Sequence, residues 1–189
     1  MVFRLLPPEE ALGSALQRCK QLKRAWCRRN GLVAPLFDAD SAMLEALARV
    51  LADKKLLHVF ALERDGVIVA ITVNFVQHDV MMAYVTTYDA AFERASPGYI
   101  LLFDYIRWSI DHGATTIDFL CGDEDYKFRF ANQHVTLLSF AGGRQATVEQ
   151  IALTRMAMGH LHDVISEIST FAHRAARGLS LRPGILQRC

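Results

Sequence analysis

The residues Ser96-Pro97-Gly98-Tyr99 have the types and spacing of a helix start that can bind an anion. Ser96 suits the N-cap, and Pro97 suits the first helical position because the N–H that it lacks would be unpaired there. The amides of Gly98 and Tyr99 would then point out of the positive end of the helix dipole, with Arg94 just upstream. Such a helix start favours a phosphate, and a pyrophosphate is a natural ligand. A well-capped helix that binds nothing is the alternative.

A polar loop rich in ionisable groups follows at residues 118–127, where the sequence reads Asp-Phe-Leu-Cys-Gly-Asp-Glu-Asp-Tyr-Lys. Carboxylates, a phenol and an ammonium group within ten residues could carry out proton transfer or bind a charged substrate. The alternative is structural. The acidic run 123–125 can be a solvated face, and Tyr126 and Lys127 can be ordinary packing and a surface charge.

Length and composition exclude several classes of protein. The chain has 189 residues, enough for one domain with a sizeable core, although it could also be half of a larger molecule. Apolar residues make up 52% and the formal net charge is +1, which excludes a disordered tail and gives no general attraction to nucleic acid or anionic membrane. The apolar runs are too short for a membrane span, and the first residues lack the apolar core of a signal peptide. We therefore expect a cytoplasmic protein without membrane insertion.

The cysteines and histidines predict no metal site. The four cysteines are scattered along the chain and form no C-x-x-C pair, so neither a zinc site nor a disulfide framework is indicated. Reduced thiols are the expectation in the cytoplasm. His160 and His162 are two residues apart on an expected helix and face different directions, so they cannot hold one ion together.

The hydrophobic pattern predicts helices near both ends of the chain and a sheet between them. Three segments rich in β-branched and aromatic residues are separated by Asp65-Gly66 and His78-Asp79, which is typical of antiparallel hairpins. The second expected helix should bury Met43, Leu44, Leu47, Val50 and Leu51. The expected helices are Pro7–Arg29, Ser41–Asp53, Tyr99–His112 and a long one from Thr147 to about Gly178. The expected strands are Leu56–Leu62, Val67–Gln77, Val80–Tyr88, Thr116–Leu120 (as a central strand) and Val135–Phe140.

This order predicts an α+β fold, and it resembles the GNAT acyltransferase superfamily. The residues are similar to the branch of the cellulose-biosynthesis type, and more distantly to the Fem-type peptidyltransferases. The motifs that carry the resemblance are Tyr88-Asp-Ala-Ala-Phe92, Arg94-Ala-Ser-Pro-Gly98, Gly113 and the loop 118–127. The resemblance implies a mostly antiparallel sheet flanked by helices, with a long C-terminal helix. The whole chain, 1–189, would be one GNAT-like domain, with 145–189 as a C-terminal helical extension.

The resemblance also implies a cofactor, acetyl-CoA or another acyl-CoA, which serves as co-substrate. Backbone groups near Val85 and Thr86 would hold the pantetheine arm as an additional strand. The helix start that includes Ser96, Gly98 and Tyr99 would bind the pyrophosphate, with Arg94 beside it.

Acyl transfer by direct attack needs a base, a polarised carbonyl and an acid for the leaving thiolate. By position in the motif, the resemblance assigns Glu124 or Asp118 as the base and Tyr126 as the acid. Lys127, together with Asp123, would bind the acceptor. That acceptor would be an amine or hydroxyl on a small molecule or a compound of the cell envelope.

Two departures from the family pattern keep other functions open. Members of this branch are often twice as long. In the phosphate loop, Pro97 removes one N–H donor, and Tyr99 stands where a small residue is common. A catalytically silent interaction domain is one alternative. A Fem-like transferase that uses aminoacyl-tRNA is another, with a docking surface made by Arg18, Lys20, Lys23, Arg24, Arg28 and Arg29. Otherwise nucleic acid is not an expected partner. A homodimer could supply a second half.

Overall fold

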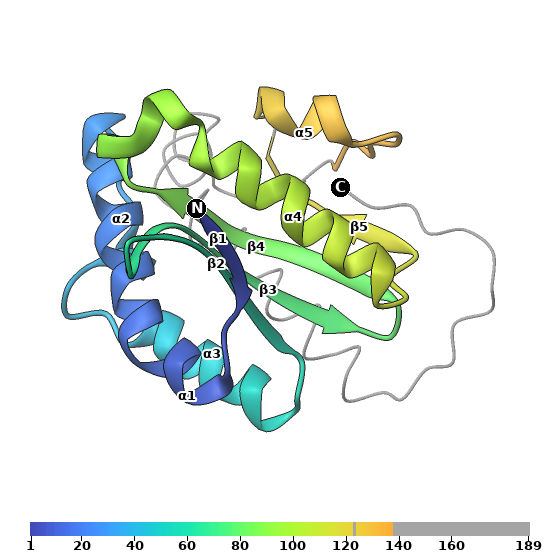
Figure 1. Ribbon diagram of the computed structural model, residues 1–189, viewed down its shortest axis with the longest axis horizontal. Helices are drawn as coiled ribbons and strands as arrows, with labels where there is room; N and C mark the ends of the chain where they lie inside the picture. The colour runs from blue at the N-terminus through green and yellow to red at the C-terminus, as the bar shows by residue number, and fades with distance from the viewer. Residues whose placement is uncertain (123, 138–189) are drawn as a thin grey trace, which may run out of the picture. The chain divides into compact units, whose positions relative to one another are not determined.

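The computed structural model describes residues 1–122 and 124–137, and the chain divides into two compact units, residues 1–120 and 121–189. The first unit contains a five-stranded sheet in the order β1-β2-β3-β4-β5 (Figure 1). Its strands are β1 (Val2–Leu5), β2 (Leu57–Arg64), β3 (Val67–Gln77), β4 (Val80–Tyr88) and β5 (Thr116–Asp118). Neighbouring strands are antiparallel except β4 and β5, which run parallel. The expected α+β fold with a mostly antiparallel sheet is therefore confirmed.

The strand predictions were accurate where turn residues mark the ends. β3 and β4 have the expected bounds, because Asp65-Gly66 and His78 supply the positive φ angles of two tight turns. β1 was not predicted, since four residues before Leu6-Pro7-Pro8 give too short a pattern. β5 ends at Asp118, two residues earlier than expected, and it lies at the edge of the described sheet rather than in its centre.

One face of the sheet is covered by the N-terminal helices. They are α1 (Pro8–Glu10), a π-helical turn η1 (Ala11–Ala15), α2 (Leu16–Arg29) and α3 (Met43–Asp53), with a 3-10 turn, η2 (Pro35–Phe37), before α3. Leu16, Cys19 and Leu44 pack with Ile71 and Val85 of the sheet in the main core cluster. In α3 the buried residues are Leu44, Ala48 and Leu51, whereas Met43 and Val50 are exposed, so the predicted apolar face was partly wrong.

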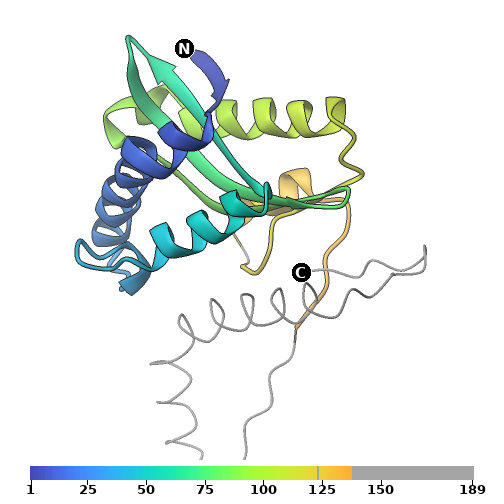
Figure 2. The same ribbon diagram turned by 90° about the horizontal axis from the view of Figure 1, so that it is seen from below.

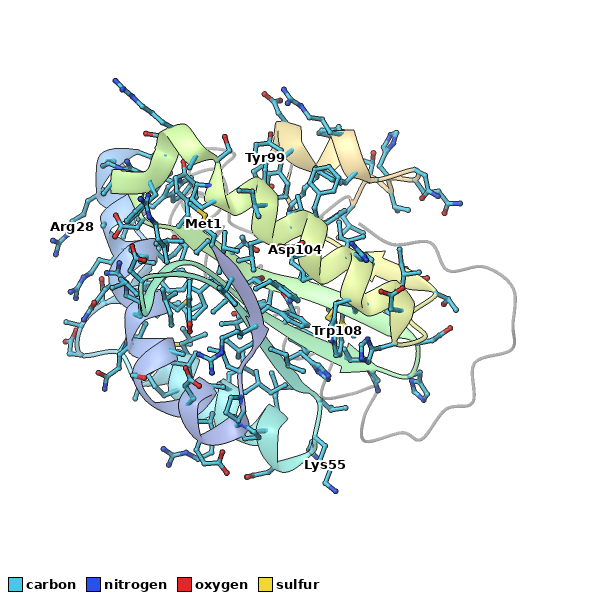
Figure 3. All side chains as sticks on the ribbon, in the orientation of Figure 1. Met1, Arg28, Lys55, Tyr99, Asp104 and Trp108 are labelled. Atoms are coloured by element: carbon cyan, nitrogen blue, oxygen red, sulfur yellow. The ribbon has the colours of Figure 1, made fainter. Side chains whose placement is uncertain are left out.

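The other face of the sheet is covered by α4 (Pro97–Asp111), which follows a short 3-10 segment, η3 (Ala90–Ala95) (Figure 2). The rings of Phe60 on β2 and Tyr105 on α4 stack with centroids 6.1 Å apart. Trp108 contacts Phe60 edge-on at 5.0 Å and lies one turn before His112 (Figure 3). These aromatic contacts fix the second half of α4 against β2.

The second unit begins at Cys121 and contains α5 (Asp125–Phe130). Residues 135–137 are not in a strand, so the predicted strand Val135–Phe140 is not formed over its first half. The rest of that segment, and the predicted long C-terminal helix, lie outside the described residues. Across residues 1–122 and 124–137, no helix is long and apolar enough to cross a membrane.

Candidate functional site

The strands β4 and β5 pair over only three residues, so among the described strands the rest of β4 has no partner on this side. Val80 pairs with Thr116 and Met82 with Asp118, where β5 ends. Among the described strands, none pairs with residues 83–88 on this side. An unpaired strand edge presents backbone N–H and C=O groups to a ligand that can extend the sheet.

The register between β3 and β4 decides which backbone groups point to this edge. A β-bulge leaves Tyr84 without a partner, because Val73 pairs with Val85 and Asn74 with Ala83. Asp89 N–H donates to Val69 O, which marks a hydrogen-bonded position of the ladder. By alternation, Val85 directs its backbone polar groups to β3, and Thr86 directs its own to the unpaired edge. The backbone polar groups of Thr86 therefore face the edge predicted to hold the pantetheine arm, whereas those of Val85 face β3.

The Thr86 carbonyl at this edge already has one contact, which the sequence did not suggest. Lys23 Nζ, from α2, donates to Thr86 O at 3.4 Å and also lies 4.3 Å from the centre of the Trp26 ring. On the α4 face of the sheet, the Thr86 hydroxyl lies 2.9 Å from that of Thr72. The side chain of Val85 is buried in the core on the opposite face.

The start of α4 offers fewer free amides than expected. Ser96 is the N-cap residue, with φ +48° and ψ 48°, and its hydroxyl makes no capping bond. Tyr99 N–H donates to Ser96 O at 3.0 Å, so its amide is not free and this part of the prediction was wrong. Within the described residues, Gly98 N–H has no backbone acceptor. Arg94 is exposed and forms no ion pair with any described side chain.

The end of β4 is packed directly against this helix start. A methyl group added at Gly98 would lie 3.2 Å from Cδ1 of Tyr88, so only a residue without a side chain fits there comfortably. Tyr88 donates its hydroxyl to Glu93 at 3.1 Å, and burial, followed by Glu93, raises the pKa of the phenol. The backbone of Gly98 therefore lies against the side chain of Tyr88, the last residue of β4.

An ion pair ties the end of β4 to α2. Arg18 Nη2 donates to Asp89 Oδ2 at 2.6 Å, and Arg18 Nε donates to Ile68 O at 3.3 Å. The other oxygen of Asp89 accepts the N–H of Ala91 at 3.0 Å. The Ala91 amide and Arg18 hold the pKa of Asp89 below its usual range.

Asp118 has a structural role at the end of β5. Its side chain is 9% exposed, and Oδ1 accepts the N–H of Leu120 at 2.9 Å. Leu120 has φ +56°, so this bond stabilises a backbone conformation that leucine rarely adopts. The predicted role of Asp118 as a base has no support from this geometry.

In the second unit, Lys127 is buried and bonded within its own loop. Its ammonium group donates to Cys121 O at 2.6 Å and pairs with Glu124 Oε2 at 2.9 Å, and the residue is 8% exposed. Gly122, with φ +124°, sits so close to both charged groups that an added methyl would collide with them. Lys127 was expected to face an acceptor, whereas here it closes a turn.

Glu124 and Tyr126 are the remaining candidates for proton transfer. Burial, and then the charge of Glu124, raises the pKa of Tyr126 to about 12. The phenol therefore keeps its proton throughout the neutral range, as an acid must. Glu124 is half exposed, with one oxygen on Lys127. Asp123, predicted to bind the acceptor, lies outside the described residues. No cluster of three metal-binding side chains occurs in the described part of the chain.

β4 has a bulge and is only partly paired among the described strands, and the helix after it starts with a glycine amide that has no backbone acceptor. A comparison with protein families also gives a match. A family profile described as an acetyltransferase (GNAT) domain matches residues 3–128. The chain belongs to the GNAT acetyltransferase family. The matched residues include β2 to β5, β1 from its second residue, and the start of α5. A comparison with curated proteins found no match.

Solved GNAT structures share this fold at low sequence identity. An aminoglycoside acetyltransferase, meta-AAC0020, from an uncultured soil sample in complex with sisomicin superposes with a TM-score of 0.53 at 17% identity, over 75% of this chain and 96% of that one. A GNAT acetyltransferase of Staphylococcus aureus gives 0.52 at 13% identity, over 74% and 98%. The aminoglycoside acetyltransferase AAC(6')-Iy in complex with a bisubstrate analogue that contains CoA gives 0.52 at 13%, over 76% and 98%.

Proposed function

We propose that this GNAT protein transfers an acyl group, most simply acetyl, from acyl-CoA to an amine or hydroxyl of a small molecule. The observation that carries the proposal is the edge of β4 that pairs with no described strand. The backbone polar groups of Thr86 face this edge, and the Gly98 amide at the start of α4 follows β4 in the chain. Pantetheine contains two amides in an extended chain, so it can extend the sheet at such an edge.

The pyrophosphate of the cofactor binds at the start of α4 in this proposal. The Gly98 N–H and the helix dipole supply a partial positive charge, and Arg94 supplies a full one. Because Pro97 lacks an N–H and the Tyr99 amide is bonded to Ser96, Arg94 carries a larger share of the attraction than it would in a loop with several free amides.

The acid and base of the reaction are proposed to come from Tyr126 and Glu124. Tyr126 is protonated at neutral pH and can donate to the leaving thiolate, while Glu124 accepts the proton of the attacking amine or hydroxyl, directly or through water. The S–C bond of the thioester breaks as the new N–C or O–C bond forms. The proton lost by the acceptor goes to Glu124, and the thiolate takes one from Tyr126.

The acceptor is proposed to be a small molecule. The solved relatives include acetyltransferases in complex with aminoglycosides, which are small polyamines. The motif over residues 118–127 favours the cellulose-biosynthesis branch within the family, and with it an acceptor related to the cell envelope. A cytoplasmic location and a possible homodimer belong to the same proposal.

A thermal and chemical stability assay with CoA and acetyl-CoA tests the proposal. At ten times its dissociation constant, CoA should raise the free energy of unfolding by about 1.4 kcal/mol. Arg94→Gln should weaken the effect, and Arg49→Gln, at an exposed arginine on α3, should not. No change at millimolar CoA would contradict the proposal.

A catalytically silent interaction domain is the second candidate, because Lys23 already contacts the Thr86 carbonyl. In that case neither CoA nor acetyl-CoA would change the stability of the wild type, and Lys23→Met would not restore binding. CoA binding that strengthens in Lys23→Met would instead show that the lysine competes with the pantetheine arm.

A further inference from the structure

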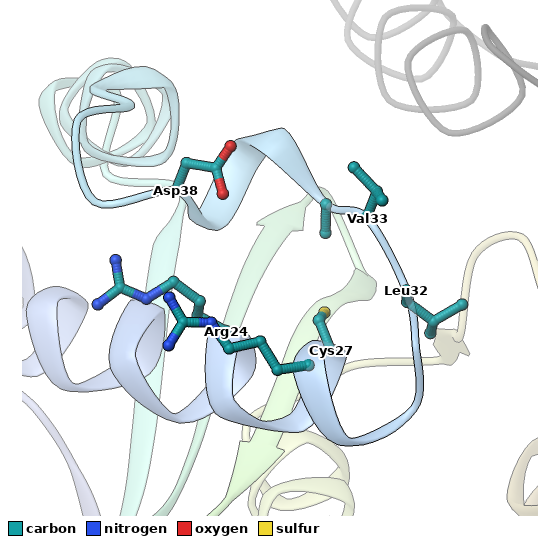
Figure 4. Close-up of a pocket in the computed structure, with 7 residues that line it drawn as sticks. Arg24, Cys27, Leu32, Val33 and Asp38 are labelled. Atoms are coloured by element: carbon teal, nitrogen blue, oxygen red, sulfur yellow. The ribbon is translucent and has the colours of Figure 1, made fainter.

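A cavity of about 200 Å³ lies beside the C-terminal half of α2, within the first unit (Figure 4). Arg24 and Arg28 line it from α2, and Asp38 lines it from the segment between α2 and α3. Cys27, Leu32 and Val33 form an apolar part of the wall. Figure 4 shows Arg24 on the helix and Asp38 on the segment across from it.

Among the described residues, the charged groups that line this cavity have no ion-pair partner, unlike other charges of the same helix. Arg18 pairs with Asp89 and Lys20 pairs with Glu45 at 2.8 Å, so the basic run of α2 is balanced over its first half. Among residues 1–122 and 124–137, no carboxylate lies within 4.0 Å of Arg24 or Arg28, and no cation lies within that distance of Asp38.

Positive side chains without a described partner therefore line one side of the cavity, and a negative side chain without one lines the other. Arg24 and Arg28 are four residues apart on one helix face, where like charges repel, so an anion between them would relieve the repulsion. A guanidinium fork matches a carboxylate or a phosphate with two parallel hydrogen bonds. Asp38 is exposed and forms no ion pair with either arginine, so its carboxylate can accept a cation of the ligand.

The wall between these charges suits a short hydrocarbon. Cys27 is 6% exposed, and burial raises the pKa of its thiol, so the group is neutral at pH 7. Leu32 and Val33 add apolar surface at the rim. At about 200 Å³ the cavity has room for a small ligand with a short hydrocarbon chain.

We propose that this cavity binds a small zwitterion, in which a short hydrocarbon links a primary ammonium group to a carboxylate or phosphate. The anionic end lies between Arg24 and Arg28, and the ammonium group lies on Asp38. The site is independent of the acyl-CoA proposal, since none of its lining residues belongs to β4 or to the start of α4.

Titration calorimetry on the full chain, without any thioester, tests this site. The probes are 4-aminobutyrate, which has seven non-hydrogen atoms, and O-phosphoethanolamine, which has eight. Their matched controls are butyrate and ethyl phosphate, which lack the amine. We expect at least one zwitterion to bind at least tenfold more tightly than its matched anion. No binding of either zwitterion at millimolar concentration, or equal affinity for zwitterion and anion, would overturn the proposal.

Variants assign the two ends of the ligand. Asp38→Asn should abolish the preference for the zwitterion and leave the affinity for the anion unchanged. The double variant Arg24→Gln/Arg28→Gln should weaken both at least tenfold, whereas Arg49→Gln, an exposed arginine on α3, should change neither. Circular dichroism confirms that each variant is folded. Retained tenfold preference in Asp38→Asn, or full affinity in the double variant, would also overturn the proposal.

Discussion

The β4–α4 region, residues 80–99, and the loop and helix at 121–131 satisfy their polar groups in opposite ways. In the first, the Gly98 N–H has no backbone acceptor among the described residues, and the backbone of Thr86 faces away from β3 with Lys23 on its carbonyl. The side chains around them mainly fix the backbone. In the second, Lys127 closes on Cys121 and Glu124, so the charged side chains are bonded to their own loop. The difference teaches that the motif richest in ionisable residues contributes part of its charge to folding, whereas the proposed binding of CoA depends on backbone geometry.

Tyr126→Phe gives the largest expected effect, because it tests whether the second region also does chemistry. If Tyr126 protonates the thiolate, kcat should fall about a hundredfold, the lower end of what a positioned acid contributes, with CoA affinity unchanged. Because its pKa is about 12, the wild-type kcat should show no loss from deprotonation of Tyr126 up to pH 10. Steady-state kinetics against pH measure both, and a wild-type kcat in Tyr126→Phe would remove this role.

Arg94→Gln tests the first region. Losing the one full positive charge assigned to the pyrophosphate should weaken CoA about tenfold, or about 1.4 kcal/mol, without a change in stability since the side chain is exposed. Calorimetry with CoA measures the affinity. Gly98 substitutions are a poorer test, because they also disturb Tyr88. A variant that binds CoA as tightly as the wild type would separate Arg94 from the cofactor.

Lys127→Met tests whether the second region is structural. The variant leaves the Cys121 carbonyl without its charged donor, and we expect a loss of about 1 kcal/mol, reduced from the usual value because Glu124 is half exposed. Hydrogen exchange of the amides at 121–131 should rise in Lys127→Met more than in Glu124→Gln, which keeps the lysine in place. Unchanged exchange would contradict a structural role for Lys127, and its predicted role in binding the acceptor would stand.

The smallest expected effect is a change of stability with pH, which comes from His58 in the sheet. Burial lowers the pKa of His58, so the folded state favours the neutral ring. The stabilisation is therefore complete above pH 6.5 and decreases as the pH falls below it. Urea unfolding at pH 7.5 and 5.5 should differ by less than about 1 kcal/mol from this group. His58→Gln should reduce the difference, and His78→Gln, at an exposed turn, should leave it unchanged.

The sequence predicted the fold better than the site. Strand ends at Asp65-Gly66 and His78 follow from local turn chemistry, which a single sequence contains. The bulge at Tyr84 was not predictable, because a bulge depends on the register between two strands. For the same reason the sequence predicted the same role, binding of the pantetheine arm, for the backbones of Val85 and Thr86, although these face opposite sides of the strand.

The side-chain contacts of the candidate site were also not predictable from the sequence. Residue types at 118–127 indicated ionisable groups, but the partners of Lys127 and Asp118 depend on positive φ angles at Gly122 and Leu120. Lys23 carried no signal, since a lysine in a basic run gives no indication that it reaches a strand 63 residues away. Long-range contacts of this kind require the folded chain.

The ion pair between Arg18 and Asp89 has a consequence for how related sequences diverge. Both side chains are about a quarter exposed, and each also bonds to the backbone, so loss of either leaves a partly buried charge without its partner. Positions 18 and 89, which are 71 residues apart, should therefore covary. Relatives that lose the carboxylate should also lose the arginine, and those changes should accompany alterations in the sequence of the segment between Asp89 and the start of α4.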